Sequence, residues 1–230
     1  MQIAPGVHQY TLPAVNAYLI ETTVGLILVD TGTPGDARRL EAMLRADGFD
    51  PAQIKIIFLT HGAVDHIGSA AHFQGLSHAQ VMAHQADVPL VEGRAQRTPA
   101  RTGVGWLIAP VFAVLSLTPM FKVTPVTVDR TVAEGDTLPD GWRVLYLPGH
   151  TPGLVGLYNP DKKVVLPGDS ISNQGGKLAP PPAIFTPDMD TAHASICKLA
   201  EYDFEVLGPG HGSAITQRAS AAVCRLADSL

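Results

Sequence analysis

The chain has 230 residues, of which 46% are hydrophobic and 16% are charged, and its formal net charge is −5. This length and composition predict one folded domain over residues 1–230 with a packed core, and they argue against disorder. The net negative charge and the absence of a run of basic residues give no surface that would bind nucleic-acid phosphates. No nucleic-acid partner is therefore expected, and a nuclease function is disfavoured.

The chain carries no clear targeting signal. No signal peptide is predicted, because a cationic stretch followed by an apolar run is missing from the start, MQIAPGVHQYTLP. Cys197 and Cys224 lack metal-type spacing and are interpreted as small buried residues of a reducing compartment. The apolar run 104–121 is interrupted by Pro110 and Pro119, which favours a buried or self-associating helical pair over a membrane span. The expected location is the cytoplasm.

The first part of the chain predicts alternating strands and helices. Apolar positions at helical spacing predict a helix over 36–49, with Gly48 as its C-terminal cap, and a second helix is expected over 66–73. Short runs rich in β-branched residues predict strands over 16–22, 25–32, 54–60 and 79–84. The run 54–60 is apolar except for Lys55 and Thr60, as expected of a strand buried on both faces.

The second part returns to this pattern after an interruption. Residues 93–123 are expected to form a helical insertion, either a lid over a substrate or, through 104–121, a homodimer contact. Beyond it, strands are predicted over 125–132, 142–148, 153–159, 163–169 and 204–210, and helices over 188–201 and 215–228. Strands in both halves with interspersed helices favour a layered α/β architecture.

Four of the predicted strands end in turns that carry His or Asp. The four segments are FLTHGAVDH (58–66), YLPGHTPG (146–153), VLPGDS (165–170) and VLGPGH (206–211). They contain His61, Asp65, His66, His150, Asp169 and His211. Imidazole and carboxylate groups at the ends of neighbouring strands are the ligands of a metal such as zinc. Glycines at 149, 168 and 210 each precede one of these residues and permit tight turns around an ion.

Other catalytic arrangements fit the sequence less well. The stretch GDSIS ends in Ser172 where a G-x-S-x-G nucleophile turn needs glycine. GGK at 175–177 lacks the upstream glycine of a phosphate-binding loop. Both cysteines lie in helix-like segments without a neighbouring catalytic motif, so a cysteine nucleophile is not favoured.

The ordered motifs resemble the metallo-β-lactamase superfamily of metal-dependent hydrolases over nearly the whole chain. The resemblance rests on VNAYLIET, LILVDTG, THGAVDH, LPGHTPG, PGDS and GPGH. It implies a four-layer αββα sandwich, with metals at one edge between two β-rich halves. It assigns His61 and His150 to a first metal site, Asp65, His66 and His211 to a second, and Asp169 to a bridge between them.

The chain departs from the family signature His-x-His-x-Asp-His at Ala63, which stands where the second His belongs. A methyl group cannot bind a metal. The first site can still bind a catalytic zinc through its two imidazoles and one carboxylate, or it is weak and only the intact second site is filled. We favour the second alternative, with one or two ions bound. Zinc is the expected metal, and manganese or iron are the alternatives.

The resemblance implies hydrolysis at a carbonyl by metal-activated water, with Asp65 and His61 as catalytic residues. Asp30 and Thr60 are candidate hydrogen-bond acceptors for His61 and His66. The expected substrate is a small ester, lactone or thioester with an apolar portion, and a β-lactam ranks lower because a fold does not determine a substrate. The alternative is a non-catalytic, metal-stabilised binding module, for which Ala63 is the support.

Overall fold

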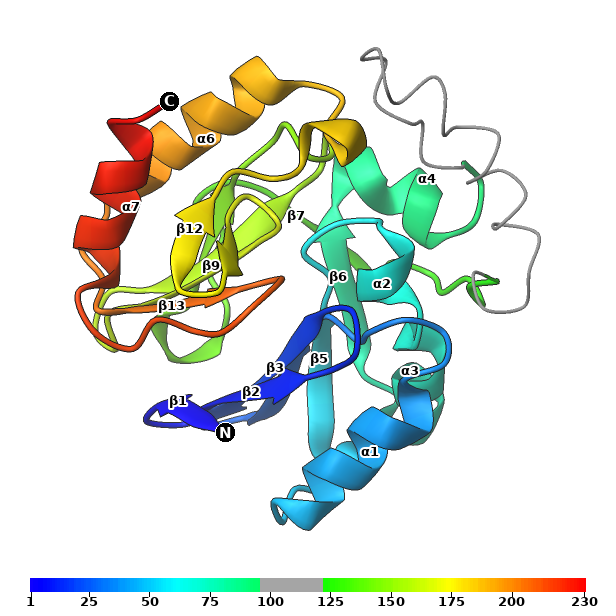
Figure 1. Ribbon diagram of the computed structural model, residues 1–230. Helices are drawn as coiled ribbons and strands as arrows, with labels where there is room; N and C mark the ends of the chain where they lie inside the picture. The colour runs from blue at the N-terminus through cyan, green and yellow to red at the C-terminus, as the bar shows by residue number, and fades with distance from the viewer. Residues whose placement is uncertain (96–121) are drawn as a thin grey trace.

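Two β-sheets packed face to face form the centre of the molecule (Figure 1). The computed structural model describes residues 1–95 and 122–230. The larger sheet follows the order of the chain: β1 (Gln2–Ala4), β2 (Val7–Thr11), β3 (Asn16–Thr22), β4 (Gly25–Val29), β5 (Ile54–Phe58), β6 (Gln80–His84) and β7 (Arg130–Val132). The smaller sheet has the order β13 (Val206–Pro209), β10 (Val164–Gly168), β9 (Val155–Asn159) and β8 (Arg143–Tyr146). A separate hairpin consists of β11 (Ser172–Gln174) and β12 (Lys177–Ala179).

Helices cover the outer faces of both sheets. The α-helices are α1 (Ala37–Ala46), α2 (Val64–Ile67), α3 (Ala70–Ser77), α4 (Val88–Val91), α6 (Met189–Ala200) and α7 (Ala219–Ala227). Short 3₁₀ turns are η1 (Pro51–Gln53), η2 (Gln85–Asp87), η4 (Pro139–Gly141) and η5 (Ala183–Phe185). In Figure 1, α6 and α7 lie along the smaller sheet, and α1 and α3 lie on the opposite side of the molecule. None of the helices in the described ranges has the length and apolar character needed to cross a bilayer.

Three buried apolar clusters fill the spaces between four layers. The first joins α1 and α3 to the larger sheet and includes Leu40 and Ile57. The second lies between the two sheets and includes Phe58 and Leu157. The third joins the smaller sheet to α6 and α7 and includes Ile196. Successive residues 57 and 58 of β5 enter different clusters, so this strand is buried on both faces as predicted. The four-layer αββα sandwich expected from the sequence is confirmed.

Several local expectations were wrong. The helix expected over 66–73 is divided into α2 and α3 at Ser69, whose backbone angles (φ −106°, ψ 9°) are not helical and whose hydroxyl donates to the carbonyl of Thr33 at 2.6 Å. A Cβ at Gly68 would lie only 2.4 Å from the Pro34 nitrogen. Of the strand expected over 125–132, only β7 forms. Cys197 is exposed rather than buried, because it lies on the outer face of α6. The expected insertion over 93–123, with its apolar run 104–121, lies mainly outside the described residues.

Candidate metal centre

Strand topology brings the predicted ligands to one edge of the sandwich. Strands β4 and β5 are parallel neighbours, so Asp30 and His61, which follow their carboxyl ends, emerge at the same edge. Strands β10 and β13 are also parallel, with Gly168 paired to Pro209, and this pairing places Asp169 beside His211. His150 comes from the loop between β8 and β9. The backbone N–H of Val155, at the start of β9, donates to the carbonyl of Thr60 at 2.9 Å and joins the two sheets here.

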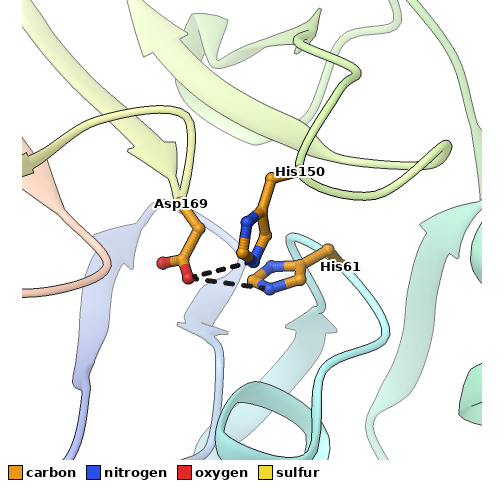
Figure 2. Close-up of side chains that lie close together, drawn as sticks. All are labelled: His61, His150 and Asp169. Atoms are coloured by element: carbon orange, nitrogen blue, oxygen red, sulfur yellow. Dashed lines mark ion pairs between the residues drawn. The ribbon is translucent and has the colours of Figure 1, made fainter. Parts of the chain in front are cut away.

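The structure gathers all six predicted residues into two groups. In the first group, Figure 2 shows the imidazoles of His61 and His150 directed toward Asp169. The Nε2 atoms of His150 and His61 lie 3.4 Å and 3.9 Å from Asp169 Oδ2. The second group contains Asp65, His66 and His211, with Asp65 Oδ2 lying 3.6 Å from His211 Nε2. Within each group the candidate ligand atoms all lie within 4.8 Å of one another.

Asp169 contacts both groups. Its Oδ1 lies 3.3 Å from His66 Nε2, and its Oδ2 lies 3.0 Å from His211 Nε2, in addition to the contacts with His61 and His150. Burial alone would raise the pKa of the Asp169 carboxyl, but the imidazoles of His66, His211 and His61 outweigh burial and hold that pKa well below its usual range. The carboxylate is therefore ionised and placed where an ion on either side can share it.

One carboxylate, that of Asp30, orients two of the imidazoles. Asp30 Oδ2 lies 2.7 Å from His66 Nδ1 and accepts the Thr60 hydroxyl at 2.7 Å. Because that hydroxyl donates to Asp30, it can accept from His61 Nδ1, 3.0 Å away. Both imidazoles then carry a proton on Nδ1 and turn Nε2 toward the centre, as metal-binding histidines do. Asp30 and Thr60 therefore make the hydrogen bonds that were expected from the sequence.

The other two imidazoles have anchors that sequence reasoning missed. His150 Nδ1 lies 3.1 Å from the hydroxyl oxygen of Thr186, and this hydroxyl donates to the carbonyl of Pro182 at 2.9 Å. His211 Nδ1 lies 2.7 Å from the carbonyl of Ala14. Nothing local in the sequence indicates these partners, because they lie 36 and 197 positions away. Each Nδ1 therefore faces an acceptor, and each Nε2 faces the centre.

The donor set fits a cation. His66 Nε2 and Asp169 Oδ1 are both buried, and neither has a hydrogen-bond partner among the described residues. Unpartnered buried polar atoms are costly, and a bound cation would satisfy both. Burial alone would lower the pKa of His66, but the carboxylates of Asp169, Asp30 and Asp65 raise it well above its usual value. This concentration of negative charge favours a positive ion at the same place.

Ala63 lies at the N-terminus of α2 and faces none of the apolar clusters. It is 2% exposed, yet it belongs to none of the three clusters in the described part of the chain. Its carbonyl accepts the N–H groups of His66 and Ile67, so its backbone starts α2. The first group thus offers two imidazoles and one carboxylate, and all three of these side chains are buried. In the second group, the side chains of His211 and Asp65 are 35% and 32% exposed.

A family model and several known proteins match this chain. The model described as the metallo-beta-lactamase superfamily matches residues 10–211. The chain belongs to this superfamily. The probable metallo-hydrolase YflN of Bacillus subtilis is 33% identical across 94% of this chain and 87% of its own length. The hydroxyacylglutathione hydrolase GloC of Haemophilus influenzae is 30% identical across 65% of this chain and 62% of its own length.

A solved structure agrees with this assignment. The structure of TTHA1623 in a di-iron-bound form is 29% identical in sequence to this chain and superposes on it with a TM-score of 0.69. The match covers 97% of this chain and 100% of TTHA1623. With the family match and the two groups of candidate ligands, this similarity identifies the chain as a metallo-hydrolase of the superfamily.

Proposed function

We propose that this chain hydrolyses a small ester, lactone or thioester with an apolar portion. The proposal rests on one observation: two groups of anchored ligands meet at a shared, ionised Asp169. A divalent cation held there would lower the pKa of bound water toward neutrality and polarise the substrate carbonyl. Zinc suits the imidazole and carboxylate donors, and manganese or iron are the alternatives; the similar TTHA1623 structure holds two irons.

The six clustered residues have distinct roles in this proposal. His61, His150 and Asp169 would hold the first ion, and Asp65, His66 and His211 would hold the second together with Asp169. Asp65 is the carboxylate on the open side of the site, so it is placed to accept a proton during hydrolysis. His61 is held by Thr60 on the closed side, where its Nε2 would bind the first ion.

One relative, GloC, supports a thioester as the substrate. GloC is named a hydroxyacylglutathione hydrolase, and the corresponding substrate here would be a thioester. Superfamily membership alone does not favour a β-lactam, because one fold serves many reactions. β-Lactamase activity therefore ranks lower.

A panel of lactones, thioesters and β-lactams, assayed with added zinc or manganese, tests the proposal. The chain would be compared with its Ala63→His and Ala63→Asp forms. Turnover of a lactone or thioester by the chain, increased in the Ala63→His form, is expected. Absence of turnover in every form that binds metal would contradict the proposal.

Ala63 also supports a second candidate function, a metal-stabilised binding module that does not activate water. Elemental analysis of protein purified with excess metal separates the two. Two ions per chain favour the enzyme. Bound metal without turnover of any substrate in the panel favours the binding module.

A further inference from the structure

A buried carboxylate outside the predicted ligand set joins the loops that carry His61 and His150. Asp87 is fully buried at the end of η2, and three groups donate hydrogen bonds to it. Its Oδ2 accepts the N–H of Gly62 and the hydroxyl of Thr151, each at 2.8 Å, and its Oδ1 accepts the N–H of Gly153 at 2.9 Å. Two of the three donors belong to residues adjacent in sequence to His61 and His150.

Asp87 gives up its usual local role in making these contacts. It occupies the N-cap position of α4, where an aspartate normally accepts a backbone N–H of its own helix at a gain of about 1 kcal/mol. Here its side chain makes no capping hydrogen bond. The carboxylate instead accepts hydrogen bonds from two loops: the loop after β5, which carries Gly62, and the loop before β9, which carries Thr151 and Gly153. These two loops belong to different sheets.

Both loops lie directly against residues 87–90. A Cβ at Gly153 would come within 2.6 Å of Asp87 Cγ, and a Cβ at Gly62 would come within 2.5 Å of Leu90 Cβ. Real Cβ atoms do not approach this closely, so only glycine allows the two backbones to reach this segment. Asp87 and α4 therefore hold the two loops together, in addition to the hydrogen bond from the Val155 N–H to the Thr60 carbonyl.

We propose that Asp87 is the positioning residue of the first metal site: it holds His61 and His150 at the separation that a cation requires. This inference rests on the proposed metal site. Because Ala63 supplies no third imidazole, the first ion depends on two histidines from different sheets. Their spacing is then as important as their chemistry. The second group has no contact of this kind with Asp87 in the described ranges.

Selective loss of the first ion in Asp87→Asn tests this assignment. Asparagine has one acceptor oxygen, so its NH₂ group would face a buried N–H donor and leave a bond unmade. First-site affinity should fall about 10–100-fold while second-site affinity is retained. A Co²⁺ titration followed by absorption would measure both steps, and the step lost in His150→Ala identifies the first site. Thr151→Val should give a smaller fall, and Thr151→Ser should restore the wild-type value.

Asn159→Ala is the matched control for general destabilisation. Asn159 is also fully buried and holds the backbone of residues 140 and 162, but it lies at the opposite end of β9 from the site. The Asn159→Ala variant should have a lower melting temperature, and both binding steps of the Co²⁺ titration should be unchanged.

Three results would overturn the proposal: equal loss of both ions in Asp87→Asn, no loss of either, or a wild-type chain that binds one ion at saturating cobalt. A wild-type chain that binds only one ion could still hydrolyse its substrate. That result would therefore contradict the role of Asp87 without contradicting the proposed function.

Discussion

Ala63 determines how many imidazoles the first group can offer a cation. The residue is buried at the start of α2, and its carbonyl accepts the N–H groups of His66 and Ile67. Its backbone therefore starts the helix, while its methyl group offers no donor atom to a cation. Since the loss of an outer hydrogen-bond partner already costs about 10–100-fold in metal affinity, the loss of a ligand should cost more.

Replacing Ala63 with histidine should restore the missing ligand. We expect Ala63→His to increase first-site affinity by at least about 10-fold, because a third nitrogen donor completes the site. Isothermal titration with zinc measures the change. Ala63→Leu adds comparable bulk without a donor and should show no gain. Equal first-site affinities in the His and Leu forms would mean that position 63 does not face the ion.

Asp30 should influence both ions, whereas Thr60 should influence one. Asp30 binds His66 directly and His61 through Thr60, so Asp30→Asn should weaken both sites by about 10–100-fold. Asparagine tolerates the positive φ of 57° at this position, so the backbone should persist. Thr60→Val should weaken the first site alone, and Thr60→Ser should behave like the wild type. Two-step metal titrations measure these effects. An unchanged second site in Asp30→Asn would contradict the orientation argued for His66.

At the scale of elements, the turn after β13 needs glycine at position 210, because the side chains of Asp169 and His66 occupy the space that a Cβ would fill. A Cβ at Gly210 would lie 2.0 Å from Asp169 Oδ1 and 3.1 Å from His66 Cε1. Gly210→Ala should displace Asp169, destabilise the fold by roughly 1–3 kcal/mol, and lower the metal content. Denaturant unfolding and elemental analysis check both effects. Gly75→Ala in α3 is the control, because nothing lies within 4 Å of its added methyl group. It should leave metal content unchanged, and retained metal in Gly210→Ala would contradict the steric argument.

The elements that carry ligands could be predicted from the sequence, and several others could not. Strand β10 is a continuous apolar run, and β5 is apolar except for the exposed Lys55, so the sequence of each strand predicts it locally. The hairpin β11–β12 is made of short polar segments around two glycines and offers no such pattern. The division between α2 and α3 falls at Ser69, whose hydroxyl donates to the carbonyl of Thr33, and this is a tertiary contact that no local pattern predicts.

The site was predictable to the extent that its residues follow strands. Asp30, His61, His150, Asp169 and His211 lie in turns that follow strands, whereas Asp65 and His66 lie in α2, which follows β5. Parallel pairing of β4 with β5 and of β10 with β13 brings the ends of these strands to one edge. Thr186 and the carbonyl of Ala14 were missed because only the folded chain brings them to His150 and His211. Asp87 also follows a strand end, that of β6, and this position was the signal that could have identified it.

At the scale of the whole molecule, metal binding and protonation should compete. Burial alone would lower the pKa of His211, but its hydrogen bond to Asp169 raises it, and the pKa of His66 is raised further by its carboxylates. Both imidazoles must lose a proton to bind metal. Affinity should therefore rise with pH through these raised values, and binding should release protons. Titration calorimetry in buffers of different ionisation heat measures the release, and an affinity independent of pH would contradict this coupling.

The metal-free protein should show the opposite trend in stability. A raised His66 pKa contributes stability that is fully present below the ordinary histidine value of about 6.5 and is lost as pH rises through the raised value. The lowered pKa of Asp169 contributes stability that is lost when pH falls through its lowered value. Urea unfolding across pH, with and without chelator, distinguishes the two forms. A metal-free chain that gains stability as pH rises above neutrality would contradict the contribution of His66.

The most direct test is an anomalous difference map from a crystal of the chain grown with zinc. We predict a strong peak at coordination distance, about 2.0–2.2 Å, from Asp65, His66, His211 and Asp169. A second, weaker peak should lie beside His61, His150 and Asp169. A map that shows zinc at neither position, from protein saturated with the metal, would contradict the claim that this edge of the sandwich is a metal centre.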